Sequence, residues 1–162
     1  MASRIVVVTG ASGAGKTAAV TRLAARSIAG VTCAFFDSVG VPLPEDMPLD
    51  WQEKTTTEWI RRLAREPADI AVLDGQTRPT FALRAFTEIG VRGSVVLFDC
   101  ARDMRKARLV ARGQPELATD DMHAWAAYLR GQADALGLPV IDTSGLGIEQ
   151  ATDALLAYVI QE

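Results

Sequence analysis

Eight consecutive residues near the N-terminus have the types and spacing of a phosphate-binding loop. They run from Gly10 to Thr17, read GASGAGKT, and satisfy the pattern GxxxxGK[ST] directly after a short apolar run. Glycines let successive backbone N–H groups turn toward one anion, and the N-terminus of the next helix adds its dipole. We expect most of the loop to contact bound phosphate: Gly10, Ser12, Gly13, Ala14, Gly15, Lys16 and Thr17.

Lys16 and Thr17 have the side chains with the most defined chemistry in this loop. A lysine at this position reaches the β- and γ-phosphates of a nucleoside triphosphate, and the adjacent hydroxyl binds Mg²⁺. The loop therefore predicts ATP and Mg²⁺ as cofactors, with Lys16 catalytic and Thr17 on the metal. The alternative is a glycine-rich turn without a ligand, which the complete match disfavours.

Two aspartates follow apolar runs that have the character of buried strands. Asp74 comes after Ile70–Leu73, and Asp37 comes after Thr32–Phe36. The carboxyl ends of parallel strands meet at the sheet edge where α/β proteins bind ligands. Asp74 has the position of a Walker B acid and would hold Mg²⁺ directly or through water. Each aspartate could instead be a helix cap or turn former.

Short apolar runs alternate with longer segments of helical spacing, which is typical of a parallel sheet with helices on both faces. The expected strands are Ile5–Val8, Thr32–Phe36, Ile70–Leu73, Val95–Phe98 and Val140–Ile141. The expected helices are Lys16–Ala29, Trp51–Arg65, Pro79–Ile89, Arg102–Ala111, Asp120–Leu136 and Ile148–Ile160. This order predicts one α/β domain over residues 1–162, a three-layer P-loop NTPase fold with a five-stranded parallel sheet and a short lid.

Two irregular segments, Ser38–Asp50 and Gly113–Thr119, interrupt this order. Loops of this kind often bind substrate or move. We place an acceptor-binding region at about residues 37–65 and the lid at about residues 112–120.

Three stretches of the chain resemble the small P-loop kinases, particularly the nucleoside monophosphate kinases with adenylate kinase. Besides the phosphate loop, residues 73–79 (LDGQTRP) are similar to the family's DGxPR segment, with Thr77 in place of the proline. The resemblance implies that Arg78 holds phosphate near the acceptor, with Asp74 and Gln76 also at the substrate. Residues 105–113 (RKARLVARG) are similar to the ERLxxRG helix end that leads into the lid.

A further loop, residues 142–147 (DTSGLG), resembles the family loop whose backbone touches adenine. The resemblance places Gly145 at the nucleotide. The same residues also form a turn and cap signal before the last helix.

Arg105, Arg108 and Arg112 have i, i+3, i+7 spacing and therefore share one helix face. An apolar face is expected from Met104, Ala107 and Ala111. The resemblance implies that Arg108 and Arg112 stabilise the charge of phosphoryl transfer, and that Arg108 also contacts the nucleotide. The alternative is a solvated basic face paired with acids.

The acceptor segment departs from the nucleoside monophosphate kinases, because residues 38–60 contain no arginine. The segment that begins at Asp37 looks more like that of kinases acting on hydroxyls, such as shikimate or chloramphenicol phosphotransferases, in which an Asp orients the acceptor. Asp37 would then be the general base. Trp51 either lines an aromatic acceptor pocket or belongs to a core stripe that includes Thr55, Trp59 and Leu63.

These residues predict an ATP-dependent kinase for a small-molecule acceptor, with a hydroxyl favoured. A nucleoside monophosphate kinase and a nucleotide-dependent regulatory ATPase are the alternatives. The absence of asparagine excludes the guanine-reading NKxD element of GTPases.

Composition restricts partners and location. A net charge of −3 and a pI near 5.2 argue against nucleic acid as a partner. The first apolar run is too short for a signal peptide, and no run is long enough for a membrane helix. We expect a cytoplasmic monomer or homodimer with no membrane partner, whose Cys33 and Cys100 are buried, reduced thiols.

Overall fold

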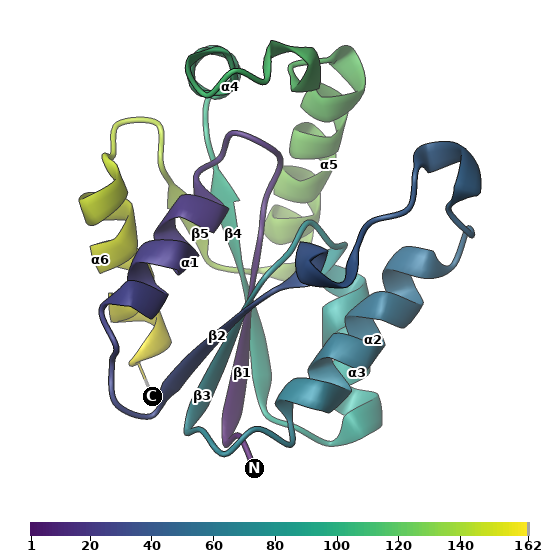
Figure 1. The fold of residues 1–162 in the computed structure, drawn as a ribbon, viewed down its shortest axis with the longest axis vertical. Coiled ribbons are helices and arrows are strands. Elements are labelled where there is room, and N and C mark those ends of the chain that lie inside the picture. Colours follow the sequence, from purple (N-terminus) through teal and green to yellow (C-terminus); the bar gives the residue numbers. More distant parts are fainter. Residues whose placement is uncertain (162) are drawn as a thin grey trace.

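Five parallel strands form the centre of the molecule, in the order β2-β3-β1-β4-β5 (Figure 1). The structure, a computed structural model, describes residues 1–161. The strands are β1 (Arg4–Thr9), β2 (Val31–Phe35), β3 (Ile70–Asp74), β4 (Gly93–Asp99) and β5 (Val140–Asp142). The helices are α1 (Lys16–Ala25), α2 (Trp51–Leu63), α3 (Pro79–Ile89), α4 (Arg102–Ala111), α5 (Asp120–Leu136) and α6 (Ile148–Val159). Single 3₁₀ turns are η1 (Phe36–Val39), η2 (Pro44–Asp46) and η3 (Pro115–Leu117).

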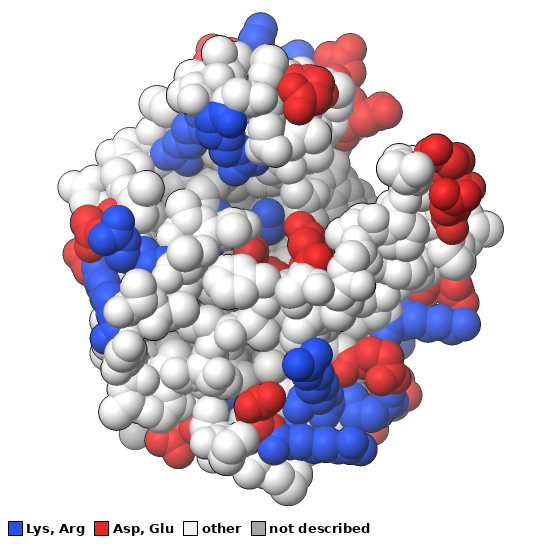
Figure 2. Space-filling view, in the orientation of Figure 1, with Lys and Arg blue, Asp and Glu red and all other residues white. Residues whose placement is uncertain are grey.

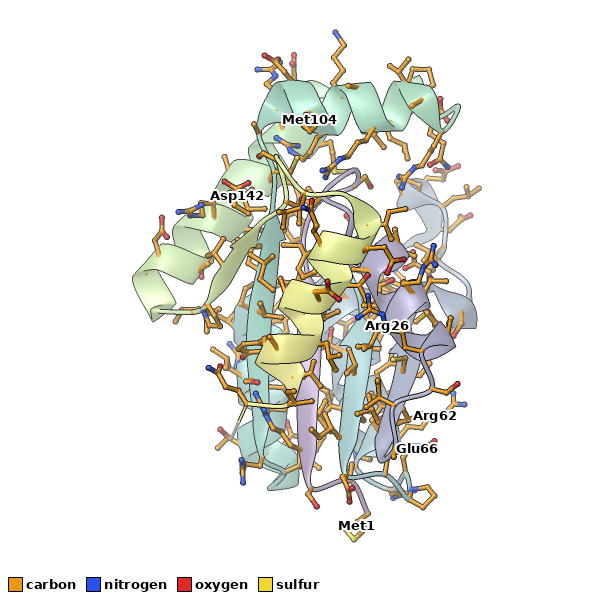
Figure 3. The ribbon with its side chains drawn as sticks, turned by 90° about the vertical axis from the view of Figure 1, so that its left-hand side faces the viewer. Met1, Arg26, Arg62, Glu66, Met104 and Asp142 are labelled. Atoms are coloured by element: carbon orange, nitrogen blue, oxygen red, sulfur yellow. The ribbon has the colours of Figure 1, made fainter. Side chains whose placement is uncertain are left out.

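Helices cover both faces of the sheet because alternate residues of each buried strand point to opposite sides. On β1, Ile5 and Val7 belong to the core cluster that includes α2 and α3, while Val6 and Val8 belong to the one with α1 and α6. Helix α5 adds a smaller cluster against β4. Figure 3 shows α6 and its side chains in front of the sheet. The predicted three-layer fold is confirmed.

The expected elements agree with the structure except at some ends. Three helices have the predicted bounds, and α3 illustrates why, because Pro79 opens it and Gly90, with φ of 77°, closes it. Helix α1 ends at Ala25 rather than Ala29. Ser27 has φ of 50°, a left-handed conformation that stops the helix before β2 begins.

The strand register places the candidate residues at one edge of the sheet. Asp74 at the end of β3 pairs with Val8 of β1 on one side and with Phe35 of β2 on the other. The phosphate loop and the segments that follow β2 and β3 therefore leave the sheet side by side. None of the helices in residues 1–161 is long and apolar enough to span a membrane.

Candidate active site

The phosphate loop has the backbone shape that its glycines permit. Gly13 and Gly15 have φ angles of 86° and 89°, in the left-handed region that favours glycine. A Cβ atom on Gly13 would lie 2.9 Å from the carbonyl oxygen of Arg105, so α4 packs directly against the loop. Gly15 is also the N-cap of α1. The loop and the helix N-terminus therefore form a cradle for an anion.

Lys16 is buried, and charges from three other segments act on it. Burial lowers the pKa of Lys16, the carboxylates of Asp74 and Asp37 oppose that shift, and Arg112 adds to it. Asp74 is the last residue of β3, Asp37 follows β2, and Arg112 follows α4. The structure thus brings together four of the residues that the sequence places at the site.

Thr17 and Asp74 form a contact that suits a divalent cation. The Thr17 hydroxyl donates a hydrogen bond of 2.7 Å to Oδ2 of Asp74. The other oxygen, Oδ1, is buried and has no hydrogen-bond partner among residues 1–161. A buried carboxylate oxygen normally has a partner, and Mg²⁺ binds few carboxylates beside water and phosphate oxygens. Thr17 and Asp74 therefore fit the metal role predicted for them.

Asp74→Asn is expected to stabilise the protein at neutral pH. Burial raises the pKa of Asp74, although Lys16 and Thr17 oppose the shift. A carboxyl with a raised folded-state pKa contributes stability that is present below its ordinary value of 3.8 and is lost as pH rises through the raised value. Thermal unfolding of Asp74→Asn at pH 7 should therefore show a higher Tm, by about 2–4 °C for each kcal/mol recovered.

The stability gain should shrink as the pH approaches the ordinary pKa of aspartate. The exposed Asp46→Asn is the control and should leave the Tm unchanged. A lower Tm for Asp74→Asn at pH 7 would contradict the inference that the buried, ionised carboxylate of Asp74 destabilises the folded protein.

Asp37 lies in the 3₁₀ turn η1, just beyond the end of β2, and is exposed. Its charge reaches both Lys16 and Asp74 and raises the pKa of each. Figure 2 shows a hollow between the α4–α5 end of the molecule and the segment of residues 37–50, with acidic side chains on both outer rims. Asp37 therefore lies within electrostatic reach of the phosphate loop and of the end of β3.

Gln76, Arg78 and Trp51 contact different neighbours. Gln76 donates through Nε2 to Oγ of Ser12 in the phosphate loop, at 2.8 Å. The Arg78 guanidinium lies over the rings of Phe81 and Tyr128, 5.5 Å and 5.7 Å from their centroids. Trp51 is half-buried and makes an edge contact with Phe36. The helix face that Trp51 shares with Thr55, Trp59 and Leu63 belongs partly to the core, since Trp59 and Leu63 are buried.

The expectation for the faces of α4 was wrong. Arg105 and Leu109 are its buried residues. The Arg105 Nε atom donates 3.0 Å to the carbonyl of Cys100. The residues expected to form the apolar face are exposed, namely Met104, Ala107 and Ala111. The physical reason is that α4 packs against Gly13 of the phosphate loop, where a Cβ would meet Arg105 and Leu109.

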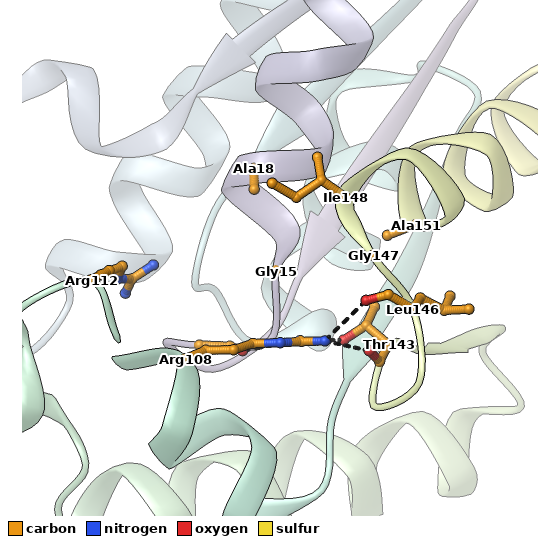
Figure 4. A pocket seen from close by; sticks show the side chains of 10 residues that line it. Gly15, Ala18, Arg108, Arg112, Thr143, Leu146, Gly147, Ile148 and Ala151 are labelled. Atoms are coloured by element: carbon orange, nitrogen blue, oxygen red, sulfur yellow. Dashed lines mark hydrogen bonds between the residues drawn. The ribbon is translucent and has the colours of Figure 1, made fainter. Parts of the chain in front are cut away.

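Arg108 lines a cavity of about 310 Å³ beside the phosphate loop (Figure 4). Its guanidinium donates to the carbonyls of Gly13, Thr143 and Leu146, and to Oγ1 of Thr143 at 3.0 Å. The Thr143 hydroxyl in turn donates 2.6 Å to the carbonyl of Ala14. Arg108 thus joins the phosphate loop to residues 143–146.

The remaining lining of this cavity is mostly apolar or backbone: Ala18, Leu146, Gly147, Ile148 and Ala151. Gly145 is exposed beside this lining rather than part of it. Arg112 also borders the cavity, and its Nε atom donates 2.6 Å to Gln114. Arg108 and Arg112 therefore differ, because Arg108 is held by carbonyl groups and Arg112 is exposed, with its charge acting on Lys16.

Several polar residues that support the site were missed by sequence reasoning. Thr143 is buried between Arg108 and the phosphate loop. Thr9, Gln52 and Thr56 hold the segment around Thr77. In the sequence, each of these residues is only a polar residue near apolar neighbours, and that pattern does not show which group it binds.

Comparisons with known proteins define the class of this fold. No family model matches the chain, and no curated protein matches it in sequence. Among solved structures, it resembles a tunicamycin resistance protein of Deinococcus radiodurans, with a TM-score of 0.71 and 18% identity over 99% of this chain and 97% of the other.

Two further structures are similar. A shikimate kinase of Acinetobacter baumannii has a TM-score of 0.60 and 17% identity over 99% of this chain and 97% of its own. A gluconokinase of Sinorhizobium meliloti 1021 has a TM-score of 0.61 and 14% identity over 97% of this chain and 94% of its own. The chain therefore has the fold of the small P-loop kinases.

Proposed function

We propose that this protein transfers the γ-phosphoryl group of ATP to a hydroxyl group of a small molecule. The observation that carries the proposal is the buried Lys16 of a complete phosphate loop next to the hydrogen-bonded pair of Thr17 and Asp74, with the charges of Asp37 and Arg112 also acting on Lys16. The names of similar structures, which include shikimate kinase, gluconokinase and a sugar kinase, support a small-molecule acceptor.

ATP, the phosphoryl donor, would bind to the phosphate loop and to Arg108 and Arg112, which line the cavity beside it. Backbone N–H groups of residues 10–17 and the Lys16 ammonium would bind the β- and γ-phosphates. Mg²⁺, held through Thr17 and Asp74, would supply positive charge to the transferred group. Arg112 would neutralise charge that develops in the transition state, and residues 112–120 would act as the lid.

The acceptor side would be served by Asp37. A hydroxyl must lose its proton as it attacks the γ-phosphorus, and the Asp37 carboxylate, just beyond the end of β2, would take that proton. No arginine is present in residues 38–60 to bind an acceptor phosphate. We infer that Asp37 is the general base and that residues 37–65 bind the acceptor.

One observation favours a second candidate, a nucleoside monophosphate kinase. The Arg78 side chain is exposed, and within residues 1–161 it forms no ion pair. A guanidinium that lies over two aromatic rings and pairs with no carboxylate in the described part of the chain could bind the phosphate of a nucleotide acceptor.

An acceptor screen tests the proposal. The protein is incubated with Mg·ATP and separate panels of nucleosides, nucleotides, sugars, cyclic polyols and antibiotics, and ADP release is compared with a reaction without acceptor. Stimulation by a non-phosphorylated hydroxyl compound is the expected result. Stimulation by nucleoside monophosphates alone would favour the second candidate, and hydrolysis that no acceptor changes would favour a regulatory ATPase.

Arg108→Ala and Arg112→Ala are expected to have different effects. Arg108 lines the cavity beside the loop and joins two segments, so its loss should weaken Mg·ADP binding by about tenfold and lower the Tm. Arg112 is exposed near Lys16, so its loss should lower kcat and leave Mg·ADP affinity nearly unchanged. Calorimetric titration and single-turnover transfer measure the two effects. Equal effects of both variants on affinity would contradict this division.

A further inference from the structure

A short irregular segment, residues 75–78, connects β3 to α3 and carries two side chains of the candidate site. Its first residue is tied to β1, since the Gly75 N–H donates 3.0 Å to the carbonyl of Val8. Gly75 and Thr77 are buried, while Gln76 and Arg78 lie closer to the surface. Because the segment belongs to no helix or strand, side chains supply several of the hydrogen bonds that hold it.

The phosphate loop holds one side of this segment. The Thr9 hydroxyl, at the end of β1, donates 2.8 Å to the carbonyl of Thr77 and lies 3.3 Å from the Thr77 N–H. The Gln76 side chain donates to Ser12. The position of residues 76–77 is thereby linked to the loop that would bind the phosphates.

Helix α2 holds the other side. The Gln52 amide donates through Nε2 to the carbonyl of Gln76 at 3.4 Å, and its Oε1 accepts from the N–H of Arg78 at 3.2 Å. One turn later, Thr56 lies 2.7 Å from the Thr77 hydroxyl. Thr56 also donates 2.6 Å to the carbonyl of Gln52. Since that bond uses its one proton, the Thr77 hydroxyl is the donor between the two threonines.

Gln52 has a special place in this network because it binds the backbone on both sides of Thr77. It is the second residue of α2, which directly follows the segment of residues 37–50. A movement of that segment over an acceptor would therefore reach Gln76 and Arg78 through one side chain.

We propose that Gln52 is a positioning residue that couples the acceptor-binding end of α2 to the phosphate loop through residues 76–78. The acceptor part of this inference rests on the proposed function. The coupling to the nucleotide site does not, because Mg·ADP alone can report it.

Hydrogen exchange measured by mass spectrometry tests the coupling in the full chain, with and without Mg·ADP. In the wild type, Mg·ADP should slow exchange in residues 48–58 as well as in the phosphate loop. In Gln52→Ala, the protection of residues 48–58 should be lost, and residues 75–82 should exchange about tenfold faster. Calorimetry should give an Mg·ADP Kd within about twofold of the wild type, since Gln52 touches no residue of the loop itself.

Two further variants separate positioning from general loss of structure. Gln52→Glu keeps an acceptor for the Arg78 N–H but loses the donor to Gln76, so its exchange should be intermediate. Thr57→Ala is the control on the same helix, because its hydroxyl bonds only within α2, to Glu53. Unchanged protection in Gln52→Ala, or no protection of residues 48–58 in the wild type, would overturn the proposal.

With an acceptor from the screen, Gln52→Ala should lower kcat or raise the acceptor KM at least tenfold, while the KM for ATP stays constant. If the wild-type protein phosphorylates none of the acceptors but shows the expected exchange pattern, the kinase assignment is refuted and the coupling stands. Normal acceptor kinetics in Gln52→Ala would refute its positioning role.

Discussion

Lys16→Ala is expected to lower kcat/KM for phosphoryl transfer by on the order of 10³ or more and to weaken Mg·ATP binding strongly. The buried ammonium of Lys16 lies in the phosphate loop, and the negative charges of Asp74 and Asp37 act on it. Its removal takes away the cation for the β- and γ-phosphates and leaves two carboxylates that repel them. Isothermal calorimetry with Mg·ATP and single-turnover transfer measure the two losses.

The fold should survive this substitution, because burial already disfavours the charged form of Lys16. Lys106→Ala is the matched control, since Lys106 is exposed on α4. Wild-type ATP affinity and turnover in Lys16→Ala would contradict the assignment of the phosphate loop.

Asp37→Asn is expected to reduce kcat by on the order of 10² to 10⁴ with little change in ATP affinity. Asparagine keeps the shape of the side chain and cannot accept the proton of an attacking hydroxyl. Rapid-quench measurement of transfer in a single turnover, with the acceptor found by the screen, isolates the chemical step. Asp46→Asn, in the same exposed segment, is the control.

The size of this loss separates the two enzyme candidates. A phosphate acceptor is already ionised and needs no base, so a loss of only a few-fold would reject the hydroxyl mechanism and favour the nucleoside monophosphate kinase. A large loss with a hydroxyl acceptor supports Asp37 as the base.

The elements were predictable where local chemistry decides them. Apolar runs such as Ile5–Val8 can be buried only at the centre of a sheet, and Pro79 and Gly90 define the ends of α3. The end of α1 was not predictable, because residues 26–29 have helix-compatible types and the need to reach β2 decides their conformation. The buried face of α4 depends on contact with Gly13, far away in sequence.

The same distinction holds for the site. The phosphate loop is local, and its pattern identified it, whereas most partners of Arg108 are backbone carbonyls, those of residues 13, 143 and 146. Gln52 likewise binds backbone groups of residues 76 and 78. Backbone partners leave no trace in side-chain type, so spacing rules could not find these contacts.

The position of β1 in the sheet has a consequence for biosynthesis. It precedes the other strands in the chain, yet its hydrogen-bonding neighbours are β3 and β4, residues 70–74 and 93–99. At about 5–20 residues per second, a ribosome needs roughly 5 to 20 s to supply the second neighbour. During that time the apolar residues of β1 cannot be buried between their two partner strands. The apolar side chains of the first strand therefore stay accessible to water and to other chains until residues 93–99 have been synthesised.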